Sequence, residues 1–242
     1  MAFAQLGHTS IASLVVPAGT IESLSELQGK TIGIKGDVPA AIQAMLAAGG
    51  APRGTFEELL LDGFDPVAHL ALGIDALPVY KSNEPASLDD AGIEYVEFDP
   101  LDYDIPASFA VYINSRENYE KWPTVIEDFV RAGLRGYQFA AENPEAAVAH
   151  AFELINLAGN QFWLAEPHEL GRWQVEQAMV ESTTPEGFAI GQLNTPRLGE
   201  EIQMLVDLGQ FETLPDWESM LDDSVVPKLY DDNGELIWVP MD

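Results

Sequence analysis

The stretch Leu27–Gly50, LQGKTIGIKGDVPAAIQAMLAAGG, decides the fold class of this 242-residue chain. Thr31–Lys35 is rich in β-branched residues and predicts a strand, and the Gly-Asp pair at 36–37 predicts a turn directly after it. Pro39 suits the first turn of a helix, and the small and apolar residues of Ala40–Gly50 predict that helix, which two glycines end. A strand, a tight turn and a helix in series form the repeating unit of an α/β fold.

The same alternation continues to about residue 104. At Thr55–Leu61 the sequence is compatible with a strand or a helix, and the strand is favoured. Apolar or alternating runs predict strands at Asp75–Tyr80 and Ile93–Phe98, and a short helix is expected at Asp65–Leu72. Strands joined by helices predict mostly parallel sheets flanked by those helices. Later in the chain, a strand is expected at Ser108–Asn114, followed by amphipathic helices at Tyr119–Ala141, Pro144–Leu157, Glu169–Glu181 and Thr195–Leu208.

Composition excludes several classes of function. Lys and Arg number 11 and Asp and Glu number 40, which gives a formal net charge of −29 at pH 7. Phosphate backbones and anionic membranes repel such a chain, so we expect no nucleic-acid partner. The chain has no cysteine, and its four histidines lack metal-ligand spacing, so no metal site and no thiolate chemistry are expected. No apolar run reaches the length of about 18 residues that a membrane-spanning helix needs.

Four segments in series carry a resemblance to a known family. They are LQGKTIGIKGD at Leu27–Asp37, DPVAHLALGIDALPVYKSNEP at Asp65–Pro85, YDIPASFAVYINSRE at Tyr103–Glu117 and FVRAGLRGYQFAAENPEAAV at Phe129–Val148. Together they resemble the type II periplasmic substrate-binding proteins of the nitrate, sulfonate, taurine and thiamine-pyrimidine group. The tyrosine at position 80 with the Asn-Glu-Pro at 83–85 is most similar to the branch that binds thiamine pyrimidine precursors.

The resemblance implies an α/β fold of the periplasmic binding protein type II, with two lobes and an incomplete first lobe. It assigns residues 1–29 to a remnant of lobe one and the crossover, and residues 30–104 to lobe two. Residues 105–242 become the return to lobe one, with C-terminal helices and a tail. Ser13–Pro17 is expected to be a strand, although no partner for it is evident in the sequence.

The function that the resemblance implies is solute binding for an ABC importer. The ligand would be a thiamine pyrimidine precursor or a similar heterocycle, held in a cleft between the lobes and delivered to the permease. We expect a monomer with no catalytic residues and no cofactor, located in the periplasm or outside the cell. A full-length form could carry a lipid anchor, and no signal segment is present in this chain.

Tyr80, Asn83 and Glu84 are the strongest candidates for ligand contact. An aminopyrimidine presents donors and acceptors along one edge of a flat ring. A carboxylate can accept from its amine, an amide can match a ring nitrogen, and a phenol can stack on its face. The alternative is a turn in which Asn-Glu-Pro only ends a strand.

Four further residues complete the candidate set. Asp37 lies in the turn after the first strand, where an acid suits an amine donor and repels an anion, although it could equally be a helix cap. Asp75 precedes a strand and could face the cleft or hold structure. Tyr103 and Ser108 lie at the proposed crossover, where either could reach the ligand or pack within its own lobe.

Three other functions stay open. A relative that binds an alkylsulfonate, nitrate or another small anion is disfavoured by Asp37 and by the net charge. An enzyme similar to the yeast-type pyrimidine synthases, which use a cysteine-rich iron site, is disfavoured because the chain has no cysteine. The chain could also bind nothing, if contacts on both sides of the cleft are required and one wall is missing.

Overall fold

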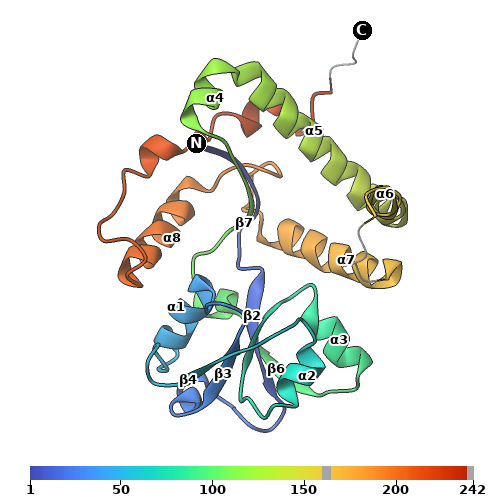
Figure 1. The fold of residues 1–242 in the computed structure, drawn as a ribbon. Coiled ribbons are helices and arrows are strands. Elements are labelled where there is room, and N and C mark those ends of the chain that lie inside the picture. The colour runs from blue at the N-terminus through green and yellow to red at the C-terminus, as the bar shows by residue number, and fades with distance from the viewer. Residues whose placement is uncertain (160–164, 239–242) are drawn as a thin grey trace. The chain divides into compact units, whose positions relative to one another are not determined.

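The structure, a computed structural model, describes residues 1–159 and 165–238. The chain divides into two compact units, and the elements of each can be followed in Figure 1. Unit 1 comprises Met1–His8, Ser108–Gly199 and Asp216–Asp242, and unit 2 comprises Thr9–Ala107 and Glu200–Pro215. Each unit is therefore assembled from segments that lie far apart in the sequence.

Unit 2 contains five strands that hydrogen bonds join side by side. β3 (Thr31–Ile34) pairs in parallel with β4 (Glu57–Leu60). β2 (Ala12–Pro17) pairs antiparallel with both β5 (Leu77–Tyr80) and β6 (Tyr95–Phe98). A parallel bridge between Ile32 and Ala76 places β3 next to β5. The spatial order is therefore β4, β3, β5, β2, β6.

The expectation of mostly parallel strands holds for β3 to β6 and is wrong for β2. The helices α1 (Ala40–Ala48), α2 (Pro66–Leu70) and α3 (Glu84–Asp90) link β3 to β6 in series, and such crossover connections return the chain in the same direction. β2 precedes this series and runs the opposite way between β5 and β6. The strand predicted at Ser13–Pro17 is thus confirmed, with both of its partners supplied later in the chain.

The core of unit 2 lies on both faces of β2. Leu14 and Val16 belong to one buried cluster that includes Met45 of α1. Val15 belongs to a second cluster with Leu88 of α3. Because both faces are covered, the strand reads as a continuous apolar run without polar alternation. Each fully buried aliphatic side chain of this kind contributes about 1.5–3 kcal/mol.

Unit 1 is built on an antiparallel pair of strands, β1 (Ala2–Gly7) and β7 (Phe109–Ile113). β1 was not expected from the sequence. Its residue Phe3 packs in a buried cluster with Val130 and Leu134 and with Leu229 near the C-terminal end of the described chain. The described helices of this unit are α4 (Arg116–Lys121), α5 (Pro123–Glu142), α6 (Pro144–Leu157), α7 (Glu166–Thr183) and the first residues of α8 (Thr195–Asp207).

The single helix predicted at Tyr119–Ala141 is wrong, because the structure breaks it between α4 and α5. Trp122 leaves the helical region with φ −132° and ψ 53°, and α5 begins at Pro123. A proline has no N–H to donate and disfavours helical backbone at the preceding residue, so it begins a new helix. The other three helices are confirmed: α6 has the predicted ends, and the ends of α7 and α8 differ from the prediction by at most three residues.

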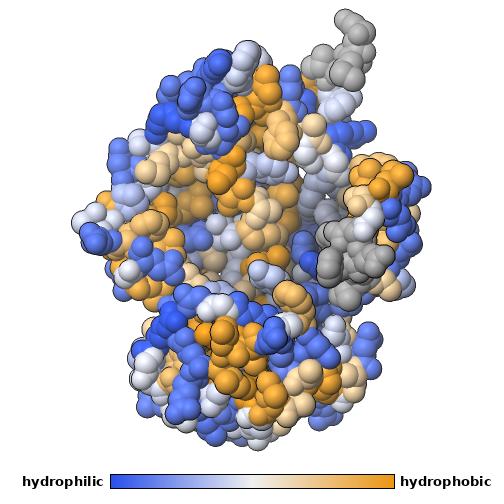
Figure 2. All heavy atoms as spheres, in the orientation of Figure 1, coloured by the Kyte–Doolittle hydropathy of each residue, from blue (hydrophilic) through white to orange (hydrophobic). Residues whose placement is uncertain are grey.

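The described surface is not uniformly polar. Figure 2 shows hydrophobic residues between hydrophilic ones on the viewed face, and the exposed hydrophobic residues of unit 2 include Leu60, Phe64 and Leu72. Over the residues that the structure covers, none of the helices is both long enough and apolar enough to cross a membrane.

Candidate ligand-binding site

The carboxyl ends of three parallel strands meet at one edge of the unit 2 sheet. Lys35 directly follows β3, Phe64 lies in the loop after β4, and Tyr80 is the last residue of β5. β2 runs the other way, so its first residue, Ala12, pairs with Tyr80 at the same edge. In open α/β sheets ligands bind outside the carboxyl ends of the strands. All four residues line a pocket of about 350 Å³ at this edge.

Four of the seven predicted site residues line this pocket, namely Asp37, Tyr80, Asn83 and Glu84. Asp37 is brought to the other three because β3 and β5 lie next to each other. The volume falls within the range of about 300–1,000 Å³ that is typical of small-molecule sites. The structure therefore groups most of the predicted residues, while their contact with a ligand stays a prediction.

Glu84 is buried, with 5% of its surface exposed, and each of its carboxylate oxygens has a donor in the protein. Oε1 accepts from Lys35 Nζ at 2.6 Å, and Oε2 accepts from the backbone N–H of Tyr80 at 2.8 Å. The second bond ties the end of β5 to the first turn of α3. An ionised carboxylate has about four acceptor positions, so a ligand donor still finds a position on each oxygen.

Lys35 is the charged residue of this pocket that sequence reasoning missed. Its Nζ lies 2.6 Å from Glu84 and 6.0 Å from the ring centroid of Phe64, which also lines the pocket and is 86% exposed. The available signal was its place as the residue following a parallel strand, just before the turn at Gly36. Gly36 has φ +103°, a backbone conformation that favours glycine, so the chain turns sharply there after Lys35.

Asp37 forms an ion pair with Arg53, which affects how its charge acts on a ligand. Its Oδ1 lies 2.8 Å from Arg53 Nη2 and accepts from the N–H of Val38 at 2.8 Å. The pKa of Arg53 is raised, first by its hydrogen bond to Glu58 against the opposing effect of burial, and then by its bond to Asp37. Arg53 is shared, since its Nε and Nη2 also donate to Glu58 at 2.6 and 2.8 Å, so it offsets the charge of Asp37 only in part.

The other three predicted residues do not line this pocket. Asp75 accepts from the N–H of Thr31 at 2.9 Å and lies 3.4 Å from Lys30, so its described contacts hold the start of β3. Tyr103 packs against the buried cluster around β2. Ser108 is the first residue of its segment of unit 1, directly before β7. A ligand role for these three stays a prediction that the geometry of this pocket does not support.

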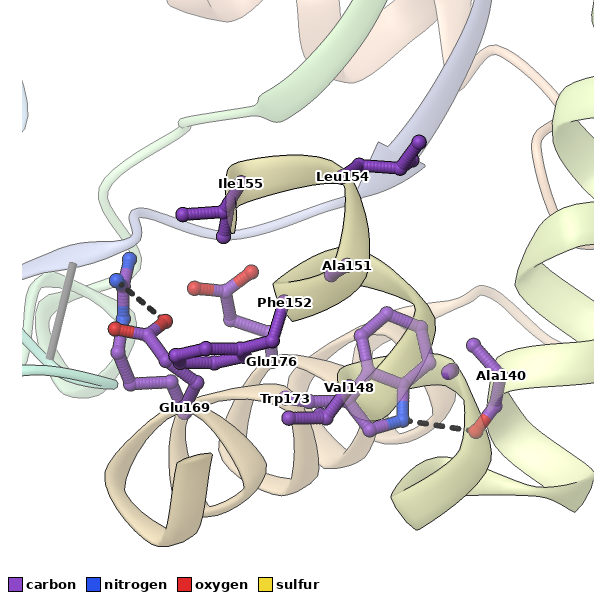
Figure 3. Close-up of a pocket in the computed structure, with 11 residues that line it drawn as sticks. Ala140, Val148, Ala151, Phe152, Leu154, Ile155, Glu169, Trp173 and Glu176 are labelled. Carbon is purple, nitrogen blue, oxygen red and sulfur yellow. Dashed lines mark hydrogen bonds and ion pairs between the residues drawn. The ribbon is translucent and has the colours of Figure 1, made fainter. Parts of the chain in front are cut away.

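A second pocket, of about 410 Å³, lies among the helices of unit 1 and is mostly apolar. Figure 3 shows Phe152 and Ile155 of α6 on the side of Glu169, and the indole of Trp173 of α7 beside Ala140. Its polar contacts are internal: Trp173 Nε1 donates to Ala140 O at 3.0 Å, and Arg172 Nη1 donates to Glu169 at 3.0 Å. This pocket contains none of the predicted residues, and the unit 2 pocket has the convergent polar groups that orient a ligand.

Within the described residues, no group of three or more histidine, aspartate or glutamate side chains is placed to hold a metal ion. His69 is buried, and its Nε2 lies 2.9 Å from the carbonyl oxygen of Asp62. In the candidate pocket, Glu84 takes a lysine as its partner. The polar groups of the site are therefore suited to hydrogen bonding with an organic ligand.

The fold matches that of periplasmic binding proteins. The periplasmic sulfonate-binding protein SsuA of Methylobacillus flagellatus superposes with a TM-score of 0.65 at 20% sequence identity, over 93% of this chain and 67% of that one. This likeness confirms the expected α/β, type II binding-protein architecture, with the mixed strand directions noted above. At 20% identity, the likeness supports a conclusion about the fold alone.

Two relatives of known description match at higher identity. One is the formylaminopyrimidine-binding protein of Halalkalibacterium halodurans, 33% identical over 135 residues. The other is the riboflavin-binding protein RibY of Chloroflexus aurantiacus, 32% identical over 143 residues. The matches cover 52% and 56% of this chain but only 40% and 39% of the relatives, so the chain matches less than half of either protein.

The family itself is defined over a longer stretch. The model of the family described as NMT1/THI5 like matches residues 1–147, which is more than half of the chain. That range includes β1 to β7 and every residue of the candidate pocket. The resemblance expected from the sequence is thus confirmed, and the chain belongs to the NMT1/THI5-like family.

Proposed function

We propose that this chain is the solute-binding component of an ABC importer and that the unit 2 pocket binds a small, flat heterocycle with an amine donor. Thiamine pyrimidine precursors are the ligand class with the best match. The observation that carries this proposal is the grouping of Tyr80, Asn83 and Glu84 in one pocket at the carboxyl ends of β3 to β5.

The chemistry of the pocket supports a heterocyclic ligand. Tyr80 is 53% exposed, so its ring is accessible for stacking on a flat ligand face. Glu84 retains acceptor capacity for an exocyclic amine, and Lys35 offers an ammonium donor to a ring nitrogen or carbonyl. A ligand with an uncharged edge that alternates hydrogen-bond donors and acceptors can therefore bond to both Glu84 and Lys35.

The relatives support the same ligand class. One is described as binding formylaminopyrimidine and the other as binding riboflavin, and both of these ligands are flat nitrogen heterocycles. By the same inference the chain acts as a monomer outside the cytoplasmic membrane and delivers its ligand to a permease. Its two units would correspond to lobes one and two of such a binding protein, with unit 2 as lobe two.

A second candidate ligand is a small anion such as an alkylsulfonate. Lys35 favours an anionic ligand, because its ammonium lies in the pocket. The buried carboxylate of Glu84 beside Lys35 disfavours an anionic ligand.

The fold alone does not decide between a binding protein and an enzyme. Purified protein that is free of iron and pyridoxal phosphate would count against an enzyme.

Isothermal titration calorimetry tests the proposal. An aminopyrimidine with a hydroxymethyl substituent, riboflavin, ethanesulfonate and nitrate would each be titrated into the chain. We expect saturable binding of an aminopyrimidine or riboflavin without turnover. A ligand at 100 times its Kd stabilises the folded state by about 2.7 kcal/mol, so thermal unfolding gives an independent readout.

Tyr80→Ala should weaken binding of the heterocycle, because the stacking face is lost. Leu72→Ala is the matched control: it removes a 65% exposed side chain of unit 2 that does not line the pocket. Equal affinity of the two variants would show that the ligand binds elsewhere. Failure of all four ligands to bind the wild-type chain would overturn the proposed function.

A further inference from the structure

Lys35 and Glu84 line the pocket and form an ion pair with each other. The ammonium and the carboxylate are 2.6 Å apart, and the two side chains are 24% and 6% exposed. Glu84 is held from the other side by the N–H of Tyr80. The carboxylate of Glu84 is therefore held in place by β5 and α3, and the ammonium of Lys35 lies next to it.

Each ionised group that lines the pocket has an opposite charge beside it. Lys35 pairs with Glu84, and Asp37, which also lines the pocket, pairs with Arg53 at 2.8 Å. Arg53 also binds Glu58, so a ligand that enters this pocket leaves water and meets no excess positive charge. An anion then loses hydration without gaining a counter-charge, whereas an uncharged heterocycle has no such cost.

We propose that Glu84, by neutralising Lys35, makes the pocket select uncharged ligands over anions. This inference rests on the proposed function, since it concerns the selectivity of the same pocket. An uncharged ligand with an acceptor next to a donor can bridge the pair, accepting a hydrogen bond from Lys35 and donating one to Glu84. A sulfonate has no donor for Glu84 and is repelled by its charge.

The substitution Glu84→Gln should reverse this selectivity. Glutamine has a similar shape, and its amide oxygen can still accept from the N–H of Tyr80 or from Lys35. Lys35 then has no full counter-charge, so the pocket gains one net positive charge. We expect the affinity for ethanesulfonate to rise by about tenfold or more, because a single charge at close range dominates binding in a partly desolvated site.

The test is a comparison of affinities by calorimetry in the full chain. Wild type, Glu84→Gln and the control Glu94→Gln would each be titrated with the hydroxymethyl aminopyrimidine, riboflavin and ethanesulfonate. Glu94 is exposed and does not line the pocket, so its variant makes the same change in net charge elsewhere in unit 2. Adding Lys35→Met to Glu84→Gln should abolish the gain in ethanesulfonate affinity.

The outcomes separate the two proposals. If wild type binds none of the ligands, the proposed function fails. If wild type binds a heterocycle but Glu84→Gln gains no more ethanesulfonate affinity than Glu94→Gln, the selectivity inference is wrong and the function stands. Stronger wild-type binding of ethanesulfonate than of either heterocycle would also overturn the inference.

A reciprocal variant covers the case in which Glu84→Gln does not fold. Lys35→Gln leaves Glu84 without its counter-charge and should shift the preference toward a cationic aminopyrimidine with an aminomethyl substituent. We expect the ratio of its affinity to that of the hydroxymethyl compound to rise about tenfold over wild type. An unchanged ratio would contradict the assignment of charge selection to this pair.

Discussion

Replacing Lys35 with methionine should destabilise unit 2 by about 2–3 kcal/mol at neutral pH. Removing one partner of a buried ion pair costs about 3–5 kcal/mol, because the other charge stays buried without compensation. Glu84 would keep only its hydrogen bond from the N–H of Tyr80. The Lys35 side chain is 24% exposed, so water reaches the pair and we place the cost below that range.

Urea unfolding followed by far-UV circular dichroism measures this loss. With a slope of about 1–3 kcal/mol per molar urea, the midpoint should fall by roughly 0.7–3 M. Hydrogen exchange of peptides that contain Thr31–Ile34 and Leu77–Tyr80 reports on unit 2 directly. All five tryptophans fall within the ranges of unit 1, so their fluorescence follows that unit and provides an internal reference.

Lys30→Met is the matched control for this prediction. Lys30 lies 3.4 Å from Asp75, but the two side chains are 44% and 27% exposed, and exposed pairs of this kind contribute only about 0–1 kcal/mol. Adding Glu84→Gln to Lys35→Met should recover part of the loss, because no charge is then left buried. Equal losses in Lys35→Met and Lys30→Met would refute the reasoning.

Three further predictions concern unit 1. Gly7→Ala should destabilise it by about 2 kcal/mol, since a Cβ there would overlap the ring of Phe109 on the paired strand, and urea unfolding followed by tryptophan fluorescence measures the change. Burial lowers the pKa of His8 below its ordinary 6.5, so its stabilising effect is complete above pH 6.5 and is lost as pH falls through the lowered folded value. Thermal melts between pH 5 and 8 should therefore show a steeper acid loss in wild type than in His8→Leu, and parallel curves would contradict this. Trp173→Phe removes the 3.0 Å bond to Ala140 O and should cost about 1 kcal/mol in urea unfolding followed by circular dichroism, and no loss would count against it.

Local chemistry predicted the elements whose form does not depend on distant partners. Thr31–Ile34 and Ala40–Ala48 follow from β-branched residues, a glycine turn and a helix-forming run. The break at Pro123 was also available from the sequence, because proline has no N–H to continue a helix. The prediction of one continuous helix gave the apolar periodicity of the segment more weight than Pro123.

Elements that depend on distant partners were harder to predict. Ala2–Gly7 has no β-branched residue, and it forms a strand because it pairs with Phe109–Ile113 from the middle of the chain. β2 was predicted as a strand, but its direction depends on β5 and β6, which follow it by more than sixty residues. Pairing direction is a tertiary property, and a hydrophobic run does not encode it.

The charge of the candidate pocket could not be predicted for the same reason. The sequence shows Asp37 as an acid in a turn and Glu84 as an acid after a strand, so it suggests a pocket that is negative. The structure supplies Arg53 to the first and Lys35 to the second, and Lys35 and Glu84 are 49 positions apart in the chain. A chain with a net charge of −29 thereby has a pocket in which a carboxylate neutralises the lysine and a shared arginine partly offsets Asp37. We therefore expect these two pairings to influence the charge of the ligand more than the overall acidity of the protein does.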